Sequence, residues 1–125
     1  MSVVIHFLNG NDNHIQSHYF QKEYRDDVIV EINARFYEVY FFVKEVMEYE
    51  MRKDGFFSFP GLIILDEISN EKICIAINNL VDIGYFNFFV GYAEIPYNNR
   101  FIHKWYKNEL SISKLEKISS YVLRN

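Results

Sequence analysis

Residues 59–86, FPGLIILDEISNEKICIAINNLVDIGYF, decide the fold, because a strand, a tight turn and a helix follow one another in this stretch. The apolar run at residues 62–65 comes directly after Pro60-Gly61. A short apolar run bounded by turn residues is typical of a strand that is covered on both faces. We therefore predict a strand at residues 62–65 with both of its faces buried.

The second half of this stretch predicts a helix at about residues 69–83. Ser69 is a good N-cap, because its hydroxyl can accept a hydrogen bond from a free amide of the first turn. Ile73 and Ile77 recur at helical spacing, and Gly84 supplies the positive φ that commonly ends a helix. This strand–turn–helix unit indicates how the chain folds, but it does not indicate a chemical reaction.

The other strands are predicted from alternating apolar positions and from β-branched and aromatic content. They cover residues 2–8, 28–32, 36–43 and 85–95, with a short aromatic edge strand at residues 101–106. Asn33-Ala34 is expected to form a hairpin turn or a bulge. Gly91, in the middle of a predicted strand, indicates a bulge or a close approach of the backbone.

Two segments show no single clear period. Residues 14–27 are polar and aromatic, and we expect an irregular region holding a short helix or an extended loop. In residues 44–53 the residue types favour a helix, whereas the alternation of Met47, Tyr49 and Met51 with charged residues favours a strand. We predict a strand there, with a short amphipathic helix as the alternative.

The chain predicts one α+β domain spanning residues 1–125, with a mainly antiparallel sheet of about five strands covered by two helices. The first helix is the one at about 69–83. The second, at about 113–124, is predicted from the capping box that begins at Ser113 and ends at Glu116.

Composition narrows the possible functions. The chain carries 13 basic and 17 acidic residues, a net charge of −4, which makes it a poor general binder of nucleic acid. The single cysteine, Cys74, allows no internal disulfide and suits a reducing, cytoplasmic location. We expect no signal peptide, and no apolar run approaches the roughly 18 residues that suggest a membrane-spanning helix.

Few residues have the spacing that chemistry requires. His14 and His18 are four apart, and with His103 they form a minor alternative, a metal-dependent hydrolase. His6 is expected to face solvent, and Cys74 to be an inert thiol inside a helix. The acidic pair Asp26-Asp27 is expected to end a strand and solvate a turn. We predict no catalytic residue, no bound metal, no cofactor and no enzyme activity.

One acidic stretch is rich in tyrosine and is the candidate partner-binding surface. Carboxylates steer a basic protein partner toward a surface, and tyrosine rings anchor it there. An ordinary solvated sheet face is the alternative. The candidate residues are Tyr37, Glu38, Tyr40, Glu45, Glu48, Tyr49, Glu50 and Asp54.

The stretch DGFFSFPGLIILDEISNEKICIAINNLVDIGYF, residues 54–86, resembles immunity proteins of bacterial toxin systems such as contact-dependent growth inhibition. This resemblance implies a cytosolic protein that binds one cognate toxin domain, often a nuclease, and blocks it. It assigns no catalytic residue. We therefore expect a protein partner, with neither nucleic acid nor membrane bound. A structural or adaptor domain that self-associates is the alternative.

Overall fold

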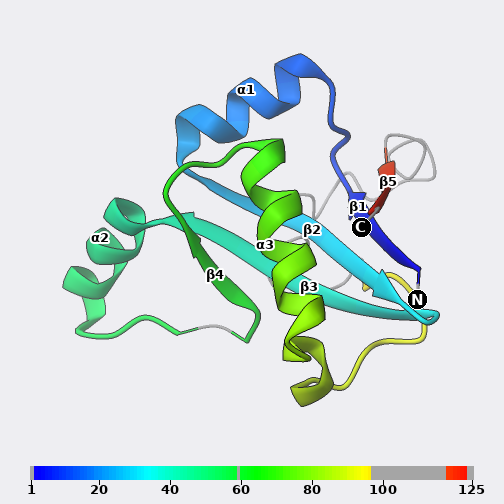
Figure 1. Ribbon diagram of the computed structural model, residues 1–125. Coiled ribbons are helices and arrows are strands. Elements are labelled where there is room, and N and C mark those ends of the chain that lie inside the picture. The colour runs from blue at the N-terminus through cyan, green and yellow to red at the C-terminus, as the bar shows by residue number, and fades with distance from the viewer. Residues whose placement is uncertain (1, 59, 97–117, 124–125) are drawn as a thin grey trace.

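The computed structural model describes residues 2–58, 60–96 and 118–123, which form one twisted sheet with helices packed on it (Figure 1). In chain order the elements are β1 (Val3–Phe7), α1 (Asn13–Lys22), β2 (Tyr24–Ile32), β3 (Arg35–Val43), α2 (Lys44–Asp54), β4 (Leu62–Leu65), α3 (Asn70–Asp82), the 3-10 helix η1 (Tyr85–Phe88) and β5 (Ser119–Leu123). The strand order is β4-β3-β2-β1-β5, and β4 is the strand that runs parallel to its neighbour. The predicted α+β class with a mainly antiparallel five-stranded sheet is confirmed.

The sheet is built around the hairpin of β2 and β3. Asn33 and Ala34 connect the two strands, with φ angles of 51° and 61°. Two successive residues at positive φ match the right-handed twist of a hairpin. The predicted hairpin turn is therefore confirmed, and it uses asparagine and alanine where glycine is more common.

The core lies between one face of the sheet and the two helices α1 and α3, as Figure 1 shows for α3. Alternate residues of β1 are buried, as its apolar pattern predicts, and α3 contributes Ile73 and Ile77. The main members of this core are Val3, Ile5, Phe7, Tyr19, Val28, Val30, Val39, Phe41, Ile73, Ile77 and Phe86. A smaller cluster around Leu8 and Ile29 occupies the opposite face.

The strand–turn–helix unit forms largely as its sequence predicts. Ser69 caps α3, and its hydroxyl accepts a hydrogen bond from the amide of Lys72 at 3.2 Å. Gly84, with φ of 77°, follows the helix and begins η1. The predicted burial of both faces of β4 is wrong, since β4 is an edge strand and Ile64 is 41% exposed.

Two predictions on the first half of the chain are wrong. Residues 14–27 are regular and not irregular: the short helix that was allowed there is α1, which Asp12 caps through the amide of Ile15, and β2 begins at Tyr24. Residues 44–53 belong to the helix α2 and not to a strand, so the alternative of a short helix is confirmed. None of the residues of α2 is buried, so the alternating apolar residues of this segment do not pack into a core. The secondary structure therefore follows the residue types, which favour a helix.

Two predictions on the second half are also wrong. Residues 85–95 form η1 and a loop, whose one backbone bridge to the sheet among the described residues joins Tyr92 to Phe36. Residues 119–123 form β5 against β1 instead of a helix, since hydrogen bonding to a distant strand prevails over local helical spacing. The predicted strand at 101–106, the predicted helical residues 113–117 and 124, and His103 lie outside the described residues. None of the helices in the described ranges has the length and hydrophobicity needed to cross a bilayer.

Candidate protein-interaction site

The predicted partner-binding residues lie in three separate places. Tyr37 lies on the core face of β3, with its ring 5.3 Å from the ring of Phe86. Glu38 and Tyr40 lie on the opposite face, where the hydroxyl of Tyr40 donates a hydrogen bond to the carboxylate of Glu38. The remaining five, Glu45, Glu48, Tyr49, Glu50 and Asp54, lie on α2. The eight predicted residues are thus divided among the two faces of β3 and the helix α2, and they do not form one surface.

The helix α2 carries acids and bases together. Lys44 lies 3.7 Å from Glu48, and Lys53 lies 3.6 Å from Glu50, each pair within one or two turns of the helix. Such exposed pairs contribute little to stability, but they offset part of the negative charge of the carboxylates on α2. The role of α2 as a binding surface for a basic partner stays a prediction.

A second group of acids and phenols lies on the sheet face opposite α3. The Oε1 atom of Glu38 is buried and has no hydrogen-bond partner among the described residues. The negative charge of Glu38 raises the pKa of Tyr92, and burial, followed by Glu38, raises the pKa of Tyr40. Burial and the charge of Asp27 raise the pKa of Asp26 to about 7. This face therefore disfavours further negative charge.

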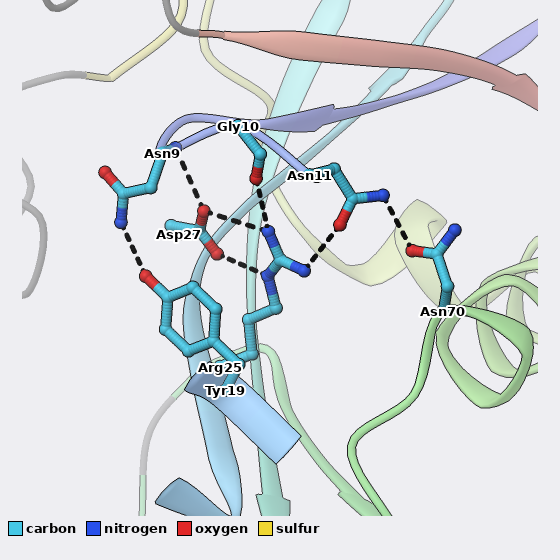
Figure 2. Close-up of polar contacts among 7 residues, drawn as sticks. All are labelled: Asn9, Gly10, Asn11, Tyr19, Arg25, Asp27 and Asn70. Carbon is cyan, nitrogen blue, oxygen red and sulfur yellow. Dashed lines mark hydrogen bonds and ion pairs between the residues drawn. The ribbon is translucent and has the colours of Figure 1, made fainter. Parts of the chain in front are cut away.

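The acidic pair Asp26-Asp27 is buried, so the prediction that it solvates a turn is wrong. Asp27 is the acceptor in a network of polar groups around Arg25, which Figure 2 shows in close-up. Nε of Arg25 lies 2.8 Å from Oδ1 of Asp27, and both residues are 1% exposed. A buried charge pair is tolerated only when further hydrogen bonds satisfy both groups.

Those further bonds come from the loop between β1 and α1. Arg25 donates to Oδ1 of Asn11 and to the carbonyl of Gly10, both at 2.8 Å, and its guanidinium carbon lies 4.3 Å from the ring centre of Phe7. The backbone amide of Asn9 donates to Asp27 at 3.0 Å. Figure 2 shows Asn9, Gly10 and Asn11 of the loop converging on the ion pair. The network holds the loop against β2. Its two charged groups, Arg25 and Asp27, bind each other.

The histidines and the cysteine do not converge. His14 and His18 are exposed on α1, and no group of three or more residues in the described ranges is arranged to hold a metal ion. The side chain of His6 is only 12% exposed, contrary to the prediction that it faces solvent, because it bonds Ser120 and Glu31. Burial raises the pKa of Cys74, as expected of an inert thiol.

The residues that sequence reasoning missed are exposed apolar side chains that follow α3. Ile83, Phe88 and Val90 are 75%, 87% and 97% exposed, and we call these three side chains the 83–90 patch. Isolated exposed apolar residues are normal, but these three are the most exposed of the large apolar side chains in the described ranges. Their signal in the sequence is the dense run of aromatic and aliphatic residues at 83–90, of which Ile83 was predicted to end a helix and residues 85–90 to begin a strand.

A pocket of about 250 Å³ lies beside this patch, between the β2–β3 hairpin and the start of η1. Apolar side chains form part of its wall, and polar side chains from the hairpin and from η1 complete it. The described residues that line it are Ile32, Asn33, Arg35, Tyr37, Val81, Gly84, Phe86 and Asn87.

The segment that carries the patch is fixed to the sheet. Phe36 and Tyr92 exchange two backbone hydrogen bonds of 2.9 Å each. A Cβ atom on Gly91 would lie 2.7 Å from Cβ of Arg35, so the predicted close approach at Gly91 is confirmed. Phe86 is buried against Tyr37. The exposed side chains of the patch therefore stand on a frame that is packed against the sheet on both sides of them.

Comparison with known proteins found no matching family model, curated protein or solved structure.

Proposed function

We propose that this chain is an immunity protein, which binds one cognate bacterial toxin domain and neutralises it by contact. The observation that supports this proposal is the 83–90 patch, three large apolar side chains exposed on a frame that the core holds in place. A few anchor side chains, often aromatic, carry most of the binding energy of a protein interface. The resemblance of residues 54–86 to immunity proteins points the same way, and the patch begins inside that stretch.

The proposal places the protein in the cytoplasm, where a toxin domain would meet it. The half-buried Cys74, with a raised pKa, suits a reducing compartment in which no disulfide forms. No cofactor is required, because inhibition by contact needs only an interface that covers the toxin's active site or an adjacent surface.

The test uses the full chain and the toxin domain encoded next to its gene. The two are purified separately, mixed and followed by isothermal titration calorimetry, and the toxin's activity is measured with and without the chain. We expect a one-to-one complex and loss of toxin activity at equal concentrations. Absence of binding, or binding that leaves the toxin fully active, would refute the proposal.

Self-association is the alternative, and one observation favours it. The edge strand β5 exposes Tyr121 and Val122, and β4 at the other edge exposes Ile64. Edge strands can pair with another chain by strand addition. Light scattering on the purified chain distinguishes the two, since a stable dimer favours self-association and a monomer favours a separate partner.

A further inference from the structure

We infer that the pocket between the β2–β3 hairpin and η1 receives one apolar side chain of the partner protein, and that Arg35 at its rim pairs with a carboxylate next to that side chain. This inference deepens the proposed function, because it states the chemistry of the partner's contact segment. It also moves the contact away from the acidic residues of α2 that the sequence singled out.

The apolar part of the inference rests on the walls of the pocket. Ile32 and Phe86 are buried, and Tyr37 and Val81 are half-buried and pack against the core. A volume of about 250 Å³ falls below the roughly 300–1,000 Å³ typical of small-molecule sites. It suits a single branched or aromatic side chain, which is how an interface anchor is usually held.

The charged part rests on Arg35. Arg35 is the one charged residue among the described residues that line the pocket. Its side chain is exposed, and its Cβ is held beside Gly91, so the start of the side chain is fixed at the rim. Among the described residues it makes no ion pair, unlike Lys44, Lys53, Lys72 and Arg25. A guanidinium with free donors matches a carboxylate in charge and geometry.

The pocket and the 83–90 patch adjoin each other in the chain. Gly84 and Asn87 line the pocket, and Ile83 and Phe88 of the 83–90 patch are their immediate neighbours in the chain. A central pocket with apolar walls, polar groups at its rim and further apolar contacts around it has the anatomy of a protein-binding hot spot. The occupant we assign is therefore an extended protein segment with an apolar residue followed by aspartate or glutamate.

The test uses capped tetrapeptides and the full-length ¹⁵N-labelled chain, followed by NMR. Three peptides are titrated to millimolar concentration: Ac-Gly-Leu-Asp-Gly-NH₂, the matched lysine peptide Ac-Gly-Leu-Lys-Gly-NH₂, and Ac-Gly-Ala-Asp-Gly-NH₂, which lacks the anchor. We expect saturable shifts of the amides of Asn33, Arg35, Gly84 and Asn87 with the first peptide. Its dissociation constant should be about two- to fivefold lower than that of the lysine peptide, the range of an exposed ion pair.

Two variants separate the ion pair from other effects. Arg35→Gln keeps the side-chain stem and should abolish the preference for aspartate over lysine, whereas Arg52→Gln on α2 is the matched control and should preserve it. The inference is wrong if the leucine peptide shifts none of the pocket amides, if the alanine peptide binds equally well, or if the aspartate preference survives Arg35→Gln. It is also wrong if the same amides shift on raising the concentration of the chain alone, because a second copy is then the occupant.

Failure here is distinguishable from failure of the proposed function. A toxin domain that binds and is inhibited, together with a pocket that ignores all three peptides, refutes this contact chemistry and leaves the immunity function standing. A pocket that binds the aspartate peptide, together with a toxin domain that does not bind, supports the contact chemistry and refutes the immunity function.

Discussion

Arg25 and Asp27 form a buried ion pair within a single strand, and the register of β2 with β3 shifts over the same stretch. A register shift of this kind inserts a residue into one strand and re-aims the side chains beside it. Here the shift accompanies the burial of three successive ionisable residues, 25–27. Asp27 is satisfied by Arg25 and Asn9, whereas Asp26 keeps its proton up to a raised pKa.

The ion pair predicts a large loss of stability when its cation is removed. Arg25→Met leaves the carboxylate of Asp27 buried without its partner, and the expected loss in the free energy of unfolding is about 3–5 kcal/mol. The exposed pair of Lys44 and Glu48 provides the control, because Lys44→Met should cost less than about 1 kcal/mol. Urea denaturation at pH 7 measures both. Equal effects of the two substitutions would contradict the structural role assigned to Arg25.

Asp26 predicts a stability that falls as pH rises. Its pKa is raised from 3.8 to about 7 on folding, so between these values the folded state binds more protons than the unfolded state. The contribution of this group is therefore fully present below about pH 4, is lost as pH rises through about 7, and amounts to about 2–4 kcal/mol. Asp26→Asn removes the titration. The difference in unfolding free energy, variant minus parent, should rise between pH 4 and pH 7 and level off above pH 8.

Urea denaturation at intervals of one pH unit follows this difference. Asp12→Asn is the matched control, since Asp12 is exposed and asparagine is an equally good N-cap. A difference for Asp26→Asn that stays flat from pH 4 to pH 8 would show that Asp26 is charged in the folded state throughout.

Two glycines at the same backbone angle predict different costs. Gly55 and Gly61 have φ of 81° and 82°, but a Cβ on Gly55 meets nothing within 4 Å, whereas one on Gly61 lies 2.4 Å from the carbonyl oxygen of Glu38. Gly55→Ala should cost about 1 kcal/mol for the left-handed conformation alone. Gly61→Ala should cost about 1–3 kcal/mol more, since β4 must move away from β3. Thermal unfolding compares them, and equal costs would mean that β4 does not pack this closely.

Turns and helix ends were the features that the sequence predicted best. Gly61, the hairpin at Asn33-Ala34 and the cap at Ser69 are local signals, and each produced the predicted turn or helix end. The strand β5 has no such signal, because its place is set by pairing of Val3 with Leu123 across the whole chain. Local spacing in residues 119–123 therefore predicted a helix that the sheet overrode.

The partner-binding surface was harder to predict than the sheet, because it depends on which way each side chain points. Adjacent residues on a strand point to opposite faces, so Tyr37 and Glu38 could not share one surface once residues 36–43 were a strand. Residues 85–95 were predicted to form a strand, but among the described residues only Tyr92 forms a bridge to the sheet, with Phe36. Without a strand partner the apolar side chains of Phe88 and Val90 stay exposed, and an interaction surface appears where a core strand was expected.

The two candidate surfaces predict opposite results for the same binding measurement. If the 83–90 patch contacts the toxin domain, the double substitution Phe88→Ser and Val90→Ser should weaken binding at least about thirtyfold, as expected when a hot spot worth about 2 kcal/mol is lost. Phe56→Ser is the matched control, because Phe56 is also 70% exposed but follows α2. The double substitution Glu45→Gln and Glu48→Gln on α2 should change the dissociation constant by less than about threefold, since its charges are exposed and partly paired.

Calorimetry with the toxin domain encoded beside this gene gives all four dissociation constants, counting the parent chain. None of these side chains belongs to the buried core, so the variants should unfold at the temperature of the parent, and circular dichroism verifies that each is folded. A large effect of the α2 substitutions with none at Phe88 and Val90 would reverse the assignment. The acidic, tyrosine-bearing helix would then be the surface that meets a basic partner, and the 83–90 patch would play no part in binding it.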